Sequence, residues 1–140
     1  MDRVFLFGVN ERPLLEHGWY DPERCGDGPL FRATAAKARL TLPKKPIEQI
    51  ALICSAPVRS LGRPLRAALI DPWERSTPVV VSWDAWHIRR YRPPSAGSLV
   101  EFLDIVIEDP WSPSRLFGST DRRILGLWVT AIRLSTSSER

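Results

Sequence analysis

The stretch AKARLTLPKKPIEQIALICSAP, residues 36–57, decides the fold class of this chain. In its first part, apolar side chains alternate with Lys37, Arg39 and Thr41, a pattern that predicts a strand with one buried face. Residues 49–56 are apolar on both faces, as is typical of a central strand. Prolines separate the two segments and follow the second, and proline in a helix interior removes a backbone donor. The stretch therefore predicts two strands.

Proline-bounded apolar segments continue outward in both directions. The chain has 13 prolines among 140 residues, roughly twice the usual share of about 5%, and long helices do not tolerate that density. The apolar runs between the prolines predict about eight strands, at residues 3–9, 33–42, 49–56, 65–70, 78–83, 86–91, 98–108 and 125–134. We therefore expect an all-β fold: residues 1–140 form a single domain, a jelly-roll-like antiparallel sandwich of two sheets.

The segment 98–108 fits two patterns. Ser98 and Glu101 have the spacing of a helix capping box, and the apolar residues that follow can form a helical stripe. Residues 105–107 are β-branched and are followed by Asp109 and Pro110, which favours a strand that ends there. We predict a strand.

The last expected strand, residues 125–134, has two faces by its alternation. One face holds Leu125, Leu127, Val129 and Ala131, and the other holds Gly126, Trp128, Thr130 and Ile132. The polar residues 135–140 are expected to fray. Residues 10–30 are polar and rich in turn residues, and a loop of this length is often functional.

Charge is unevenly distributed along the chain. Lysines and arginines total 20 and aspartates and glutamates 16, which gives a formal net charge of +4. Residues 37–66 hold seven basic residues and one acid, whereas residues 93–114 hold four acids and no basic residue. A site for single-stranded nucleic acid interleaves aromatic and basic side chains, and the basic window has no aromatic residue. We interpret it as a solvated sheet face and expect no nucleic-acid ligand.

The sequence lacks the motifs of several catalytic and metal-binding classes. It contains no P-loop, no G-x-G-x-x-G motif and no G-x-S-x-G elbow. Cys25 and Cys54 lack zinc-ligand spacing with the two histidines, and we expect free thiols. Asp21, Asp27 and Asp109 offer oxygens for a structural calcium ion, but their spacing does not support one. We expect no catalytic residue, no metal and no cofactor.

No apolar run approaches the ~20 residues of a membrane-spanning helix. Residues 4–9 are apolar and follow Arg3, but the run is too short for a signal peptide and lacks a small-residue cleavage site. We therefore expect a soluble, cytoplasmic protein with no membrane span.

Six tryptophans are the main functional lead in the composition. Three lie on expected strands and are assigned to the core: Trp83, Trp86 and Trp128. The other three lie in turns beside proline, aspartate or glycine: Trp19, Trp73 and Trp111. An exposed indole stacks on the apolar face of a sugar ring, whereas a buried indole closes the end of a sandwich. For Trp73 and Trp111 both interpretations stay open.

Three segments together resemble a known family of domains. They are GWYDPE at residues 18–23 followed by Phe31 and Arg32, AKARLTLP at residues 36–43, and STDRRILGLWV at residues 119–129. Over residues 5–134 the sequence resembles an accessory β-sandwich domain often attached to bacterial glycosyltransferases, similar to galactose-binding-domain-like folds and carbohydrate-binding modules. It departs from that pattern at Ala33, where a tryptophan commonly follows the arginine, so a sugar platform built on that tryptophan is lost here.

The resemblance implies a non-catalytic carbohydrate-binding module, accessory to polysaccharide biosynthesis. Its implied partners are a glycan ligand and a glycosyltransferase or another protein. The candidate ligand-binding residues are Trp19, Tyr20, Glu23, Trp73, Trp111, Asp121 and Arg122. The sequence holds no transferase domain, so we expect it to act alone or with another polypeptide. The alternative function is a protein-interaction or structural sandwich without glycan affinity.

The same residue types also have a structural interpretation. Glu23 is expected to pair with Arg32 or Arg122 and so to tie the long first loop to the last turn. Asp121 is expected to accept amide hydrogen bonds, as aspartate does in turns. Gly126 is expected where the backbone approaches a neighbour closely. The sequence leaves both the staple and the direct ligand contact open.

Overall fold

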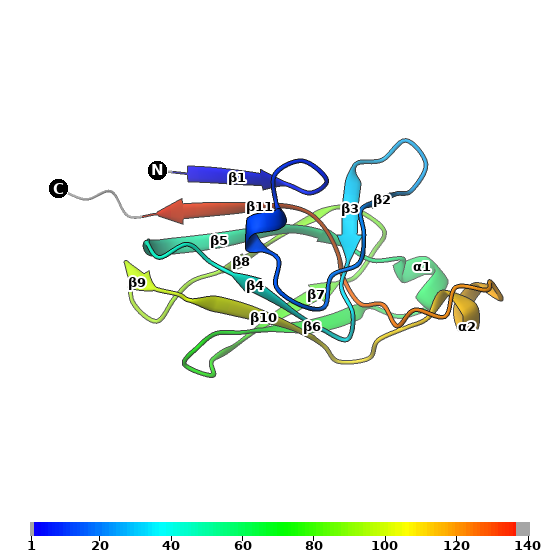
Figure 1. The fold of residues 1–140 in the computed structure, drawn as a ribbon. Helices are drawn as coiled ribbons and strands as arrows, with labels where there is room; N and C mark the ends of the chain where they lie inside the picture. The colour runs from blue at the N-terminus through cyan, green and yellow to red at the C-terminus, as the bar shows by residue number, and fades with distance from the viewer. Residues whose placement is uncertain (1, 137–140) are drawn as a thin grey trace.

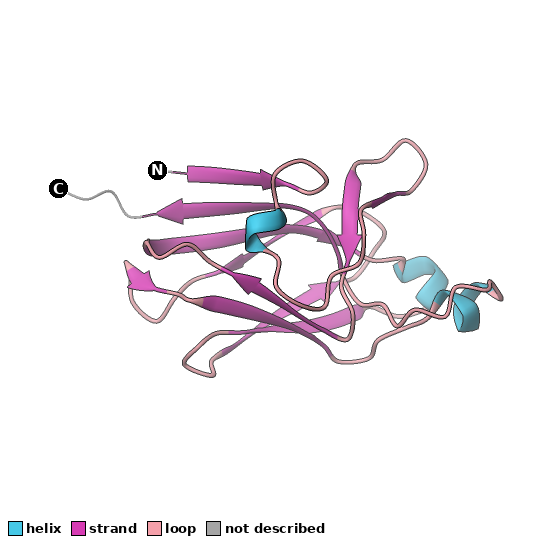
Figure 2. Cartoon of the chain, in the orientation of Figure 1, coloured by secondary structure: helices cyan, strands magenta, loops and turns pink. Residues whose placement is uncertain are grey.

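The chain folds as a β-sandwich of two antiparallel sheets. The computed structural model describes residues 2–136, which hold eleven strands and three short helices. The sheets lie face to face as two layers (Figure 1), and loops and short helical turns connect them (Figure 2). This confirms the expected all-β sandwich, although its strands are more numerous than the eight expected.

The larger sheet has seven strands and the smaller sheet four. The larger follows the order β2-β3-β11-β5-β8, with β1 paired to β11 and β9 to β5. Its strands are β1 (Asp2–Leu6), β2 (Glu23–Arg24), β3 (Leu30–Ala33), β5 (Pro46–Ser55), β8 (His87–Tyr91), β9 (Ser98–Leu99) and β11 (Trp128–Thr136). The smaller follows the order β4-β10-β6-β7, and its strands are β4 (Lys37–Thr41), β6 (Leu65–Ile70), β7 (Ser76–Val81) and β10 (Phe102–Ile107). The helices are η1 (Arg12–Leu14), α1 (Val58–Leu61) and α2 (Pro113–Phe117).

The core fills the space between the two sheets. Ile50 and Leu52 of β5 are fully buried, as are Leu103 and Ile105 of β10 in the facing sheet. Full burial of one such side chain contributes about 1.5–3 kcal/mol. The core therefore fixes which face of each strand points outward, and the outer faces are where a ligand or partner can bind.

Residues 33–42 form two strands in different sheets rather than the single strand expected. β3 ends at Ala33 and pairs with β11, whereas β4 begins at Lys37 and pairs with β10. Thr34 supports the crossing, because its backbone N–H donates to Leu127 O at 2.8 Å and its hydroxyl accepts from Leu127 N at 3.0 Å. The polar backbone groups are thus paired where the buried chain passes from one sheet to the other, as buried backbone requires.

The last strand differs from its expected alternation. β11 begins at Trp128, and its register against β5 shifts between Val129 and Ala131, so Thr130 is an inserted residue. After the shift the buried core residues are Ile132 and Leu134, while Ala131 pairs with Ile53 on the outer face. The expected placement of Ala131 on the same face as Val129 is therefore wrong, because the β-bulge reverses the faces.

Residues 98–108 are extended, as expected, but they are interrupted. β9 pairs with β5 in the larger sheet, and β10 pairs with β4 and β6 in the smaller one. Of the tail expected to fray, residues 135–136 belong to β11, and residues 137–140 lie outside the described part of the chain. Within residues 2–136, no helix is long and apolar enough to cross a membrane.

Candidate functional site

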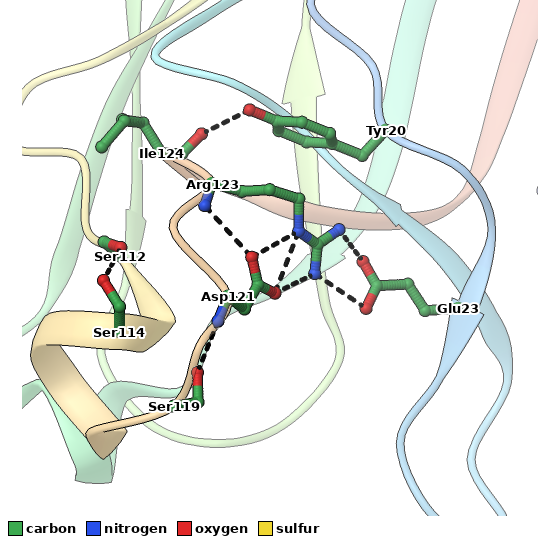
Figure 3. Close-up of polar contacts among 8 residues, drawn as sticks. All are labelled: Tyr20, Glu23, Ser112, Ser114, Ser119, Asp121, Arg123 and Ile124. Atoms are coloured by element: carbon green, nitrogen blue, oxygen red, sulfur yellow. Dashed lines mark hydrogen bonds and ion pairs between the residues drawn. The ribbon is translucent and has the colours of Figure 1, made fainter.

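The predicted ligand-binding residues fall into separate parts of the sandwich. α1 and α2 lie together at one end, which we call the α1/α2 end (Figure 1). Trp73 lies in the turn between β6 and β7, at the opposite end, and is 46% exposed. Tyr20, Glu23 and Asp121 meet near α2 (Figure 3). The structure therefore separates Trp73 from the other candidates.

Arg123 is the residue that joins Tyr20, Glu23 and Asp121. Its Nη1 donates to Glu23 Oε2 at 2.8 Å, and its Nε and Nη2 donate to the Asp121 carboxylate at 3.0 and 2.6 Å (Figure 3). The guanidinium carbon lies 5.2 Å from the centroid of the Tyr20 ring. The Tyr20 hydroxyl donates to Ile124 O at 3.1 Å. We call Tyr20, Glu23, Asp121 and Arg123 the arginine cluster.

In the arginine cluster, the predicted partner of Glu23 is wrong and the predicted amide contact of Asp121 is confirmed. Glu23 pairs with Arg123 instead of Arg32 or Arg122, because Arg32 is committed to Glu11 at 2.9 Å and Arg122 is exposed. The first loop is nevertheless tied to the last turn, as expected for a staple. Asp121 Oδ1 accepts the backbone N–H of Arg123 at 3.1 Å, the amide contact expected of an aspartate in a turn.

Charge pairing sets the protonation states in the cluster. Hydrogen bonds from Arg123 lower the pKa of Asp121 below its usual range. Hydrogen bonds to Asp121 and Glu23 raise the pKa of Arg123. Asp121 is therefore ionised at neutral pH. Arg123 engages the side-chain oxygens of both Asp121 and Glu23, which stabilises the loop and leaves fewer free oxygens for a ligand.

Trp111 and Trp19 are anchored by hydrogen bonds to the backbone. Trp111 is 7% exposed, and its Nε1 donates to Gly126 O at 3.0 Å. Trp19 is half-buried, its Nε1 donates to Arg39 O at 3.0 Å, and its ring meets Phe7 edge-on at 5.5 Å. Of the two interpretations left open for Trp111, its burial favours the one in which it closes the end of the sandwich.

Gly126 lies where the chain passes close to the core, as expected. A Cβ atom there would come within 2.2 Å of Ile107 Cγ1 and 2.7 Å of Thr34 Oγ1. A side chain at this position is therefore excluded by contact, and the glycine lets the segment before β11 pack under Trp111.

The main concave surface of the α1/α2 end is a groove of about 420 Å³ that the sequence did not reveal. Four aromatic side chains line it: Phe31, Trp86, Phe117 and Trp128. Its polar side chains include Ser55, Ser60 and Asp84. We call this hollow the end groove. None of its four aromatic residues was among the predicted ligand-binding residues.

Strand pairing explains how the aromatic side chains converge. Trp128 pairs with Ala33 on one side and with Ser55 on the other. Trp128 stacks on Phe31 with ring centroids 4.7 Å apart, and Phe31 lies 5.9 Å from Trp86. These packed rings line the end groove on the outer face of the larger sheet, where a ligand can reach them.

Of the three tryptophans assigned to the core, Trp128 packs against it and also lines the groove, Trp86 lines the groove, and Trp83 is at the surface. Trp86 and Trp128 are half-buried. Trp83 is 60% exposed, because β7 ends at Val81 and the residue lies in the following loop rather than on a strand. Trp86 also lies outside a strand, because β8 begins at His87. Trp128 is on an outer strand face, where the alternation is the same as on an inner face, so the sequence pattern did not separate the two faces.

The structure also locates the cysteines and the loop acids. Cys25 is an exposed free thiol and Cys54 a buried one, and burial raises the pKa of Cys54 to about 12. Within the described residues, no group of three or more histidine, cysteine, aspartate or glutamate side chains is arranged to hold a metal ion.

Comparison with known proteins gives a similarity of fold. No protein-family model matches the sequence, and no curated protein matches it significantly. A solved structure of CBM86, a low-affinity xylan-binding module from Roseburia intestinalis, aligns with 98% of this chain and 96% of that chain, at 11% identity and a TM-score of 0.47. A Podospora anserina GH26-CBM35 β-(1,4)-mannanase aligns with 99% of this chain and 28% of that chain, at 10% identity and a TM-score of 0.55. The second alignment shows that this fold is similar to part of a chain that contains a CBM35 module.

Proposed function

We propose that this chain is a non-catalytic carbohydrate-binding module and that the end groove holds the sugar. The observation that carries the proposal is the composition of the groove, in which four aromatic rings line a hollow that also contains Asp84 and two serines. A sugar ring has apolar C–H faces and a rim of hydroxyls. Aromatic walls with a few fixed polar groups suit such a ligand.

The packing of the rings supports this function. Phe31 is 4% exposed and holds Trp128 on one side and Trp86 on the other. Side chains held in this way lose little further conformational freedom when a ligand binds. The similarity to the chain that contains a CBM35 supports the same proposal at the level of fold. A link to a glycosyltransferase or to polysaccharide biosynthesis stays a prediction from the sequence resemblance.

The carboxylates near the groove favour binding over catalysis. Glycoside hydrolases with two catalytic carboxylates place them about 5–10 Å apart across the scissile bond. Among the described residues that line the end groove, Asp84 is the only carboxylate. Glu23 and Asp121 are close to each other, but both are paired with Arg123.

A glycan array followed by calorimetry on the strongest ligand tests the proposal. We expect Trp86→Ala and Trp128→Ala to weaken binding at least about tenfold, which corresponds to about 1.4 kcal/mol. Phe117→Ala, at a side chain that is 56% exposed, tests the groove with little risk to folding. Trp73→Ala is the matched control at the opposite end and should bind as the wild type does. The proposal is wrong if no glycan binds, or if all four variants bind equally well.

The outer face of the larger sheet favours the alternative of a protein-interaction module. Leu6, Ala131, Ile53 and Ile88 are consecutive partners across β1, β11, β5 and β8. Leu6 is 50% and Ile88 48% exposed, so this row is an apolar strip on the surface. A chain without glycan affinity, whose self-association in sedimentation experiments is abolished by Ile88→Lys, would support the alternative.

A further inference from the structure

A second hollow lies directly beside the end groove and is not part of it. It has a volume of about 390 Å³ and is lined by Val58, Arg59, Ser82, Trp83 and Asp84. Asp84 lines the end groove as well. The two hollows therefore meet at Asp84, with Trp86 on one side of this residue and Trp83 on the other.

Trp83 presents its ring to solvent while its ring and its backbone oxygen contact neighbouring residues. It is 60% exposed, yet its ring meets the His87 ring edge-on at a centroid distance of 4.3 Å. Its backbone oxygen accepts the N–H of Ala85 at 2.9 Å and lies 3.2 Å from His87 Nε2. His87 is itself buried, at 7% exposure. An exposed large aromatic side chain held in this way is suited to stacking on a ligand.

The polar side of the second hollow is also fixed in place. Asp84 Oδ1 accepts the backbone N–H of Arg59 at 2.8 Å, which ties the β7–β8 loop to α1. Arg59 and Ser82 are exposed at the rim. A guanidinium and a hydroxyl beside an aromatic ring repeat the combination of apolar and hydrogen-bonding groups found in the end groove.

The spacing of the two tryptophans allows one ligand to contact both. Trp83 and Trp86 are three residues apart, so their Cα atoms are separated by at most about 11 Å. We propose that a glycan in the end groove continues across Asp84 onto Trp83, so that the ligand is an oligosaccharide chain and not a single sugar. The inference rests on the proposed function and adds the length of the ligand and a second subsite.

Calorimetry with short and long glycans tests the second subsite. The probes are the di- and hexasaccharides of β-(1,4)-linked xylose, mannose and glucose. We expect the wild type to bind at least one hexasaccharide more tightly than the matching disaccharide. Trp83→Ala should weaken hexasaccharide binding roughly three- to tenfold, the loss of one aromatic contact, and should leave disaccharide binding unchanged.

The controls separate failure of the inference from failure of the proposed function. Trp73→Ala removes an exposed indole at the other end of β7, a strand about 20 Å long, and should change neither affinity. Suppose that a glycan binds on the array. The second subsite alone is then overturned if short and long probes bind with equal affinity, if no probe binds, or if the Trp83→Ala variant binds as the wild type does. Absence of any glycan binding on the array overturns the function and the subsite together.

Discussion

The buried ion pair between Glu11 and Arg32 gives a stability prediction whose size depends on pH. Arg32 Nε donates to Glu11 Oε2 at 2.9 Å, and Arg32 Nη1 donates to Tyr20 O at 3.1 Å. The backbone N–H of Gly8 also donates to the Glu11 carboxylate. The two side chains are 2% and 11% exposed. The pair therefore joins the backbone at Tyr20 and the turn at Gly8 to Arg32 of β3.

Arg32→Met removes the guanidinium and keeps much of the side-chain volume. The variant leaves the Glu11 carboxylate charged and buried without its cation, which costs about 3–5 kcal/mol. The double variant Glu11→Gln and Arg32→Met removes both charges. We expect it to recover about 2 kcal/mol or more of that loss, because no buried charge is stranded.

Lowering the pH should reduce the loss in free energy of unfolding that Arg32→Met causes. In the wild type, desolvation raises the pKa of Glu11, but hydrogen bonds from Gly8 and Arg32 outweigh it and leave the pKa below its usual value. A carboxyl with a depressed folded pKa contributes stability above its unfolded pKa and loses it as the pH falls through the folded value. Without Arg32, desolvation dominates and the folded pKa rises, so the variant gains relative stability as Glu11 takes up a proton.

Urea denaturation followed by tryptophan fluorescence measures these differences at about pH 7 and about pH 4.5. The expected result is a large free-energy penalty for Arg32→Met at neutral pH, a smaller one in acid, and partial rescue in the double variant. A neutral-pH penalty below about 1 kcal/mol, the value typical of an exposed pair, would refute the reasoning. So would a penalty that stays constant across the two pH values.

Three further measurements test other parts of the structure. Gly126→Ala should destabilise the fold by about 1–3 kcal/mol, because the new Cβ would lie 2.2 Å from Ile107 Cγ1. Adding Ile107→Ala should lower Tm by less than the sum of the two single changes, and strict additivity of the Tm losses would contradict this contact. The hydrogen bond from Arg39 lowers the pKa of Asp104, so the stability that Asp104 contributes is lost as the pH falls through its folded pKa. Asp104→Asn should therefore make the decline of Tm in acid shallower, and parallel curves of Tm against pH for the variant and the wild type would contradict this role. Ellman's reagent should titrate Cys25 in the native protein and both thiols in denaturant, because Cys54 is buried and its pKa is raised to about 12; reaction of both thiols in the native state would contradict that burial.

The tryptophans show where alternation along a strand reaches its limit. Alternation predicts that β8 and β11 have two faces, but an outer face covered by a neighbouring aromatic ring resembles a core face in sequence. Trp128 was assigned to the core on this basis, and it packs against the core while it also lines the end groove. Trp83 and Trp86 were misplaced for another reason, since both lie between the end of β7 at Val81 and the start of β8 at His87, where the alternation of a strand no longer holds.

The staple shows a different limit, that of choosing a partner from spacing. The sequence predicted that Glu23 ties the first loop to the last turn, and it does so through Arg123. Arg122 and Arg123 are adjacent, and one residue reverses the direction of a side chain in extended backbone. The bulge at Thr130 has the same effect on β11 and leaves no signature in the sequence. Segment positions were therefore predictable, whereas side-chain directions depended on local register.

The folded charge distribution bears on the kind of glycan that we propose for the end groove. The basic and acidic windows contact each other, because Lys37 and Arg39 pair with Asp104 across β4 and β10, and Arg63 pairs with Asp109. This pairing weakens the field that a basic window would direct toward a polyanion. The end groove and the second hollow beside it are lined by one guanidinium, that of Arg59, next to the carboxylate of Asp84. Polyanion binding uses several cations together, so these hollows are better suited to an uncharged polysaccharide than to a highly sulfated or phosphorylated one.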